Sequence, residues 1–449
     1  MSHPVPGMNR RGFLQGALAA AALPLVASCG GGSTGDAKEL TFWNFYGPNE
    51  DGATPQSKRV SGWFTQLAAD WNANNDVKVK PHYIPVAEYI NGSSLQTAFS
   101  AGQGPDIFVV SPGDFMRYYN GGVLQDLTPH LSAEAKADFR PGVLENRMVD
   151  GKVYGLPMEI EPLAMFYSVQ AFESAGLSEA DIPTTWDQLL NVAEKLTTNK
   201  RFGLMFETTP GYYQNFTWYP FMWMGGGSAV NGNKSGFDSP ATVQALKLWQ
   251  DVAKRGLGLK KPAGDGGGDV TANMVAGLCA MQQTGIWSVS DLTANAKDFK
   301  YGVFPLPTPP NGKGATDMGG WAFVANAKGG NPEAAAKFIT WALGSTDQAG
   351  VERQRQWNTV IKTNLPPRLS VSKAAEAQGA FATPVLATFA NKIAPAGRPE
   401  PRYPAEIYQA VSDAIQASQL GGADPAKAAA DASAKIDSFL QGYQGAPII

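Results

Sequence analysis

The chain has 449 residues, 43% of them hydrophobic, with 36 basic and 39 acidic side chains. It is long enough for more than one core, because single hydrophobic cores stop growing near roughly 250–300 residues. The balanced charge argues against nucleic acid or an anionic bilayer as a partner. From this length we expect two lobes. The three histidines have no His or Cys neighbour at ligand spacing, so we expect no metal site, and we expect no cofactor.

Residues 1–28 are typical of an export signal. Arg10 and Arg11 precede an apolar run that is too short to span a bilayer and that ends just before Cys29. The ending resembles a lipobox, so we expect Cys29 to be lipidated, with an ordinary secretory signal as the alternative. The arginine pair resembles a twin-arginine signal, and residues 29–38 are expected to form a flexible tether.

The first part of the mature chain has the alternation of an α/β domain. Residues 39–43 predict a strand, and the polar loop after it contains Asn44, Tyr46 and Glu50. A helix is expected from about Lys58 to Asn74, with its aromatic residues in the core. A second strand over 77–84 and a helix over 86–100 follow. A buried strand then starts near residue 106 and is expected to end in a loop that contains Asp114.

An apolar, strand-like segment follows the turn at residues 150–151 and carries two carboxylates, Glu159 and Glu161. A second apolar run over 163–169 comes next. Thr184 or Thr185 then caps a helix whose apolar residues lie at helical spacing. Carboxylates are uncommon in an apolar strand, so Glu159 and Glu161 are candidates for a functional role.

Aromatic residues are unusually dense over 212–223, ahead of three glycines. Some of these rings must be core, and for Phe216, Trp218 and Trp223 core packing and ligand contact are equally open. A strand over 280–286 ends at Trp287, and its Cys279 is expected to be a buried small hydrophobic residue. Helices are predicted over 407–420 and 425–440.

Several short motifs occur in a fixed order: GQGPDI at 102–107, GKVYGLP at 151–157, TWDQL at 185–189, FDSP at 237–240, AMQQTGIW at 280–287, GGW at 319–321 and PPR at 366–368. In this order the chain resembles the extracellular solute-binding proteins of ABC importers, the class that includes maltodextrin-type sugar binders. Each motif alone is weak, but together they cover essentially the entire mature chain.

The resemblance implies an α/β, two-lobe periplasmic-binding-protein fold of type II-like topology, with hinge crossings and a ligand cleft between the lobes. Residues 39–158 plus about 319–356 would form lobe one, and 159–318 plus about 357–449 lobe two. The protein would close on its solute and present it to the transmembrane subunits of an ABC permease. It would be a monomer outside the cytoplasmic membrane, held to the outer face of that membrane by its lipid anchor alone.

The resemblance also implies ligand-binding residues, from both lobes and the hinge: Asn44, Tyr46, Glu50, Asp114, Glu161, Phe216, Trp218, Trp287, Trp321 and Arg402. Glu161 matches a hinge carboxylate that takes sugar hydroxyls in maltodextrin binders, whereas Glu159 is expected to be solvated. Dense rings and carboxylates favour a neutral mono- to oligosaccharide, since rings stack on the apolar face of a pyranose. Glycerol 3-phosphate or a similar anion is the alternative within the class.

A secreted glycoside hydrolase using Glu159 and Glu161 is the enzymatic alternative. Residues i and i+2 of a strand share a face, about 6.6 Å apart at ~3.3 Å per residue. Both groups would approach from one side, however, whereas glycoside hydrolysis needs carboxyl groups that flank the scissile bond. No common catalytic or nucleotide-binding motif is present either, so we expect a binding protein without catalytic residues.

Overall fold

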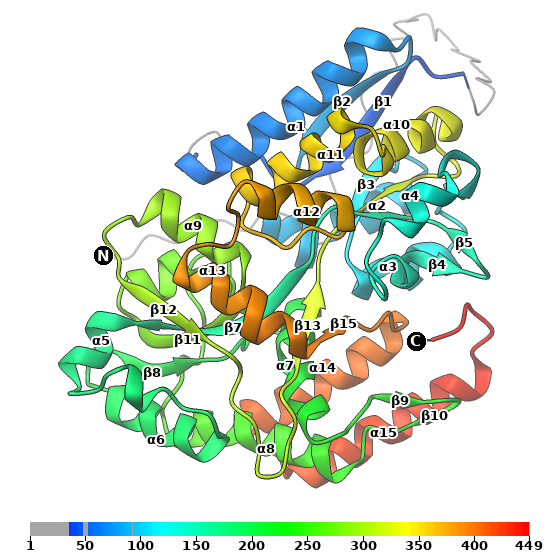
Figure 1. The fold of residues 1–449 in the computed structure, drawn as a ribbon. Helices are drawn as coiled ribbons and strands as arrows, with labels where there is room; N and C mark the ends of the chain where they lie inside the picture. The colour runs from blue at the N-terminus through cyan, green and yellow to red at the C-terminus, as the bar shows by residue number, and fades with distance from the viewer. Residues whose placement is uncertain (1–35, 48–52, 92, 449) are drawn as a thin grey trace, which may run out of the picture. The chain divides into compact units, whose positions relative to one another are not determined.

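The computed structural model describes residues 36–47, 53–91 and 93–448, and its strands form two main sheets (Figure 1). The first sheet has the order β2-β1-β3-β14-β6. Its strands are β1 (Glu39–Asn44), β2 (Lys78–Tyr83), β3 (Ile107–Val110), β6 (Leu156–Pro157) and β14 (Ala322–Ala325). β1 runs parallel to β2 and β3, whereas β14 runs antiparallel to β3 and β6. The chain therefore leaves this sheet after β6 and returns to it with β14.

Helices and turns cover the first sheet, and we call this part the first lobe. They are α1 (Pro55–Asn74), η1 (Ala87–Asn91), α2 (Ser94–Ser100), α3 (Pro112–Asn120), η2 (Thr128–His130), α4 (Ala133–Ala137), η3 (Glu145–Arg147), α10 (Pro332–Gly344) and α11 (Gln348–Arg355), with the hairpin of β4 (Met148–Val149) and β5 (Lys152–Val153). The expected core face of α1 is confirmed, because Trp63, Phe64, Leu67 and Trp71 are all buried. Thr54 caps this helix by accepting a hydrogen bond from the Ser57 amide.

The second sheet has the order β15-β13-β7-β11-β8, with β12 also paired to β7. Its strands are β7 (Glu161–Ser168), β8 (Phe202–Met205), β11 (Cys279–Gly285), β12 (Tyr301–Phe304), β13 (Thr316–Gly319) and β15 (Gly397–Pro399). Every residue of β7 is buried. Leu163 and Met165 face one core while Ala164 and Phe166 face another, since successive side chains of a strand point to opposite faces. The apolar run of β7 thus reflects burial on both sides.

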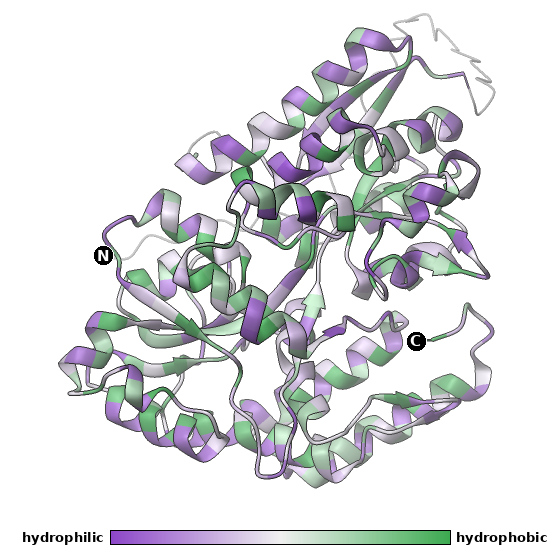
Figure 2. Ribbon diagram, viewed as in Figure 1, coloured by the Kyte–Doolittle hydropathy of each residue, from purple (hydrophilic) through white to green (hydrophobic). Residues whose placement is uncertain are grey.

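The second lobe consists of this sheet and the elements packed on it. They are α5 (Val169–Ser174), η4 (Glu179–Asp181), α6 (Trp186–Leu196), α7 (Tyr212–Met224), α8 (Pro240–Lys254), η5 (Thr271–Val275), α9 (Trp287–Asn295), α13 (Pro384–Thr388), η7 (Phe389–Ile393), η8 (Ala394–Ala396), α14 (Ala405–Gln419), α15 (Pro425–Gly442) and the hairpin of β9 (Val230–Asn231) and β10 (Lys234–Ser235). Thr185, not Thr184, caps α6, in a capping box with Gln188. Helices such as α6 and α15 alternate between polar and apolar colours in Figure 2, as expected for helices with one solvated side. Within the described ranges, no helix has both the length and the apolar character needed to cross a bilayer.

Three segments connect the two sheets: residues 158–160, residues 320–321, and a stretch through η6 (Gln356–Ile361) to Leu365. The first and third are bonded to each other, because Ile160 and Leu365 exchange backbone hydrogen bonds. The second requires a glycine: Gly320 has a φ of +129°, and a Cβ there would lie 2.2 Å from the Glu159 carbonyl oxygen. These observations confirm the expected two-lobed α/β fold with hinge crossings.

One detail differs from expectation. The strand near residue 110 does not end in a loop, because Ser111 caps α3 immediately and Pro112 occupies its first turn. The division expected near residue 357 stays a prediction, and the contacts favour a later one. Arg368, just before α12 (Leu369–Ala377), pairs with Asp138 of the first lobe at 2.7 Å. Ala446, in the tail after α15, also belongs to the first-lobe core.

Candidate ligand-binding site at the hinge

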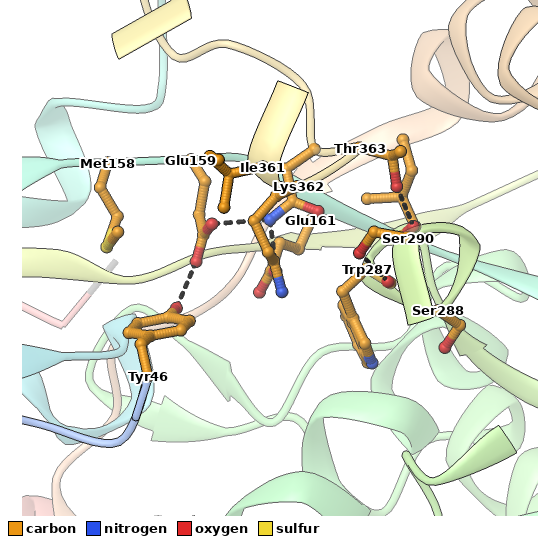
Figure 3. Close-up of polar contacts among 12 residues, drawn as sticks. Tyr46, Met158, Glu159, Glu161, Trp287, Ser288, Ser290, Ile361, Lys362 and Thr363 are labelled. Carbon is orange, nitrogen blue, oxygen red and sulfur yellow. Dashed lines mark hydrogen bonds and ion pairs between the residues drawn. The ribbon is translucent and has the colours of Figure 1, made fainter. Parts of the chain in front are cut away.

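Glu159 is the centre of a buried hydrogen-bond network in the first crossing. Glu159 is 1% exposed, and its carboxylate accepts hydrogen bonds from three side chains that are distant in sequence, of which the bond from Tyr46 is drawn in Figure 3. The Tyr46 hydroxyl donates to Oε1 at 2.5 Å, while Trp357 Nε1 and Asn364 Nδ2 donate to Oε2 at 2.9 and 2.6 Å. The expectation that Glu159 is solvated is therefore wrong. A buried carboxylate needs such donors because it loses its hydration shell.

Glu161, at the start of β7, shares a donor with Glu159. Asn364 Nδ2 donates to both carboxylates, and it lies 2.7 Å from Glu161 Oε1. Lys362 Nζ lies 4.0 Å from the same oxygen. Burial, and after it the neighbouring Glu159, raise the pKa of Glu161, Lys362 and Asn364 oppose the rise, and the net result is a pKa of about 8. The site thus holds one carboxyl group that takes up a proton easily.

Aromatic rings from both lobes form a chain near these carboxylates, in which each ring lies close to the next. Phe45, after β1, lies with its ring centre 4.6 Å from that of Trp321, in the second crossing. Trp321 lies 6.4 Å from Tyr212 of α7, Tyr212 lies 6.2 Å from Phe216, and Phe216 lies 6.4 Å from Trp287. We call these five residues the ring series. In the view of Figure 3, Glu161 and Lys362 lie between Glu159 and Trp287. Rings and hydrogen-bonding groups therefore meet at the hinge.

Most of the predicted ligand residues lie at or next to this cluster. Asn44 accepts a hydrogen bond from the Tyr46 amide and so fixes the turn that aims Tyr46 at Glu159. Phe216, Trp287 and Trp321 belong to the ring series, and Glu161 lies beside Lys362. Trp287 is half-buried at the start of α9. Their contacts with a ligand stay predictions.

Asp114 also lies on an element that borders the ring series. It is on α3, half-buried, with Arg117 Nη1 at 3.4 Å from its Oδ1, and burial raises its pKa while Arg117 opposes the rise. The neighbouring Gly113 packs against Tyr212, because a Cβ on Gly113 would lie 2.5 Å from that ring. Asp114 is therefore one residue from a contact between α3 and the ring series.

Two predicted residues lie elsewhere, and two fall outside the described residues. Trp218 is 0% exposed, with Tyr219 and Phe237 against its ring, so it cannot stack on a sugar unless the core repacks. The Arg402 guanidinium donates hydrogen bonds to the carbonyl oxygens of Met148, in the first lobe, and Pro447, in the C-terminal tail. These bonds connect parts of the fold, so the role of Arg402 in the structure is to hold them together. Glu50 and Cys29 are not among the described residues.

Sequence reasoning missed the partners that shape the site. Trp357 lies in η6 and Lys362 and Asn364 lie just after it, in the third crossing, and no sequence motif assigned a role to these three side chains. Tyr212 was seen only as one of many rings, yet its hydroxyl donates to Glu400 Oε2 at 2.9 Å. The only available signal was the density of polar residues within that crossing.

Glu400 belongs to a second buried acidic pair. It follows β15, and Asp317 is on the adjacent strand β13. Both are fully buried, and burial raises the pKa of Asp317 and brings that of Glu400 to about 8. Among the described residues, the Asp317 oxygens and Glu400 Oε1 have no hydrogen-bond partner. The pair is connected to the ring series by the hydrogen bond that Tyr212 donates to Glu400.

Comparisons with known proteins identify relatives of this chain. The chain is similar to the galactooligosaccharide-binding protein of Bacillus subtilis, with 25% identity over 430 residues, 92% of this chain and 93% of that protein. It is 24% identical to the arabinooligosaccharide-binding protein of the same organism over 344 residues, 72% of this chain and 74% of that one.

Solved structures share the fold. A solute-binding protein of an ABC transporter from Thermotoga lettingae, bound with α-D-tagatose, matches 90% of this chain and 100% of its own with a TM-score of 0.74 and 24% identity. The GacH receptor of Streptomyces glaucescens, solved unliganded and with acarbose, matches 91% of this chain and 100% of its own with a TM-score of 0.72 and 21% identity. The family described as bacterial extracellular solute-binding protein matches residues 54–349, about two thirds of the chain. The chain therefore belongs to the bacterial extracellular solute-binding protein family.

Proposed function

We propose that the protein captures a neutral mono- to oligosaccharide between its lobes and delivers it to an ABC permease. The observation that carries this proposal is the ring series beside the hinge carboxylates. Aromatic faces suit the apolar C–H face of a pyranose, and carboxylate oxygens accept bonds from its hydroxyls. The relatives named for galactooligosaccharides and arabinooligosaccharides, and the similar structures with tagatose and acarbose, support the same ligand class.

Capture by closure requires contacts from both lobes, because a ligand shifts a conformational equilibrium only by its difference in affinity for the two states. The ring series meets this requirement. Phe45 is attached to the first sheet, Trp321 to a crossing, and Trp287 to the second lobe. A sugar that stacks on rings from both ends would hold the lobes in the closed arrangement.

The hydrogen-bonding groups of the site favour a neutral ligand. Glu161 and Asp291 lie near Lys362, and burial raises the pKa of both carboxyl groups, that of Glu161 to about 8. A carboxyl group that keeps its proton both donates and accepts hydrogen bonds, which suits the hydroxyls of a sugar. The relatives named for oligosaccharides support this ligand class over glycerol 3-phosphate, the alternative within the class.

The arrangement of Glu159 and Glu161 supports a binding protein over a glycoside hydrolase. The family and the similar structures are binding proteins. Glu159 is occupied by three donors and shares Asn364 with Glu161, so the two acids act as one network on one side of the site. A glycosidase pair would have to flank a bond instead.

We further propose that the protein acts as a monomer tethered outside the cytoplasmic membrane through lipidated Cys29. The sequence around Cys29 and the extracellular character of the family support this address. Metabolic labelling with an alkyne fatty acid should mark the wild type and not Cys29→Ser. Labelling of both forms would contradict the anchor.

Thermal-shift screening and calorimetry of the purified protein test the ligand class. The panel should contain galactose, galactobiose, arabinobiose, maltose, maltotriose, mannobiose and tagatose, beside spermidine, a tripeptide and glycerol 3-phosphate. We expect at least one sugar to raise the melting temperature, and Trp287→Leu to weaken its binding by about tenfold or more. Trp341→Leu, a half-buried tryptophan that packs on Trp71, is the matched control. A panel in which only the non-sugar solutes stabilise the protein would refute the proposal.

A further inference from the structure

Glu400 is a buried carboxyl group that the proposed function does not use. It follows β15 in the second sheet and is 0% exposed. A Cβ on Gly319, the last residue of β13, would lie 2.6 Å from the Phe216 ring and 3.2 Å from Glu400 Oε2. The carboxyl group and a member of the ring series therefore pack against the same residue.

Tyr212 is the member of the ring series that Glu400 contacts directly. Its hydroxyl donates to Glu400 Oε2 at 2.9 Å. Gly113 of α3 packs against the same ring, since a Cβ there would lie 2.5 Å from it. A tyrosine ring is placed by its two side-chain torsions, and a hydrogen bond at the hydroxyl restrains both of them. Without the bond to Glu400, the Tyr212 ring would be free to turn out of the series.

Glu400 is itself held where the first lobe meets the second sheet. Asn146 Nδ2, in η3 of the first lobe, donates to the Glu400 carbonyl oxygen at 2.7 Å. The neighbouring Arg147 donates from Nη2 to the Gly320 carbonyl oxygen, in the second crossing, at 2.6 Å. The support of Tyr212 is therefore tied to the first lobe as well as to the sheet that carries Glu400.

The buried pair of Glu400 and Asp317 is not neutralised by arginine. The two arginines whose charge reaches the pair are engaged elsewhere: Arg147 is bonded to the second crossing, and Arg398 is exposed, with its guanidinium 4.8 Å from the centre of the Trp223 ring. Within the described residues, both Asp317 oxygens and Glu400 Oε1 lack a hydrogen-bond partner. Two buried carboxyl groups without a paired cation cannot both be charged, so the pair retains a proton at neutral pH.

This proton is lost in a defined pH range. Burial, and after it the charge of Glu400, raise the pKa of Asp317, and Arg398 opposes the rise. Burial raises the pKa of Glu400, the bond from Tyr212 and the charge of Arg147 oppose the rise, and the net result is a pKa of about 8. The other titratable groups that face the pair are Asp114 of α3, Arg147 of η3, Arg398 of β15 and four tyrosines, Tyr212, Tyr219, Tyr403 and Tyr408. Burial raises the pKa of all four tyrosines, so they stay uncharged in this range.

We propose that Glu400 is a positioning residue of the ligand site, which holds the Tyr212 ring for stacking while its pair with Asp317 keeps a proton. This inference rests on the proposed function and adds to it a dependence of ligand affinity on pH. While the pair keeps its proton, Glu400 Oε2 accepts the bond from Tyr212 and the ring stays in the series. When the proton leaves to solvent, the two carboxylates repel each other and the ring loses its support. Affinity therefore falls as pH rises through about 8.

A double-mutant cycle tests the positioning. Calorimetry at pH 7 uses whichever solute of the panel above binds. We expect Tyr212→Phe and Glu400→Leu each to weaken binding about two- to tenfold, the worth of one ring contact, and the double variant to bind no more weakly than the weaker single variant. Glu400→Gln keeps an acceptor for Tyr212 and should stay within about twofold of wild type. Tyr301→Phe, on β12 and stacked on Phe166, is the control.

A pH series tests the proton, and it replaces the cycle if Glu400→Leu does not fold. Between pH 6.5 and 9.5 the affinity of wild type should fall more than that of Glu400→Gln, so that the variant binds about threefold or more tightly than wild type at pH 9.5. Glu161 also titrates near pH 8, but it is present in both proteins, so the ratio of their affinities isolates the pair. Asp317→Asn should behave like Glu400→Gln, because it removes the repelling partner.

Fluorine NMR with 5-fluorotryptophan reports on the ring without a ligand. The Trp321 ring lies 6.4 Å from that of Tyr212, and its resonance is assigned with Trp321→Phe. It should shift with a midpoint near pH 8 in Glu161→Gln, and not in the variant that also carries Glu400→Gln.

The outcomes separate this inference from the proposed function. Additive losses in the cycle would overturn the inference and leave sugar binding standing. So would a constant affinity ratio across the pH series, or a Trp321 resonance that shifts in the same way with and without Glu400→Gln. Stabilisation by non-sugar solutes alone would refute the proposed function, and the cycle and the pH series with that solute would still decide the role of Glu400.

Discussion

The raised pKa of Glu161 makes folding stability depend on pH in a defined direction. Its ordinary value is 4.5, and burial together with Glu159 brings it to about 8. Between these values the unfolded chain has lost the proton that the folded protein still holds, so the free energy of unfolding falls as pH rises. At about 1.4 kcal/mol per pKa unit, the loss is on the order of 5 kcal/mol at most.

The substitution Glu161→Gln removes this proton while keeping an acceptor for Asn364. We expect wild type and variant to be similar near pH 4.5, and the variant to become progressively more stable up to about pH 8. Urea unfolding at steps between pH 4.5 and 8.5 measures the difference directly. Glu173→Gln, at an exposed position on α5, is the control. A constant difference between wild type and Glu161→Gln across this pH range would refute the reasoning.

Three further substitutions test the hinge network. Tyr46→Phe and Trp357→Phe each remove a donor from Glu159 and should each cost about 1–3 kcal/mol of unfolding free energy. Because they share one carboxylate, the double variant should cost less than the sum, and strict additivity in urea titrations would contradict the shared network. Gly320→Ala should cost more than about 2 kcal/mol, since its Cβ would meet the Glu159 carbonyl, whereas Gly379→Ala, with φ +73° and open space, should cost about 1 kcal/mol. Equal melting temperatures for the two alanine variants would show that the crossing is not tightly packed.

Local patterns predicted much of the fold because they act within a few residues. Thr185 with Gln188, and the apolar face of α1, form in the structure as their spacing indicates. The order of motifs predicted the two lobes and the family. The loop expected at Asp114 is wrong, because Ser111 caps a helix there and Pro112 occupies its first turn.

The sequence by itself determined the class of fold, the positions of most helices and strands, and the region that carries the hinge acids. Only the tertiary structure decided which of these side chains meet. Glu159 is bonded by residues 113, 198 and 205 positions away, and no local pattern reports a pairing across such separations. It likewise decided that Trp218 is core whereas Tyr212 borders the site, because neighbouring positions of one aromatic helix face different surroundings that are supplied by distant parts of the chain.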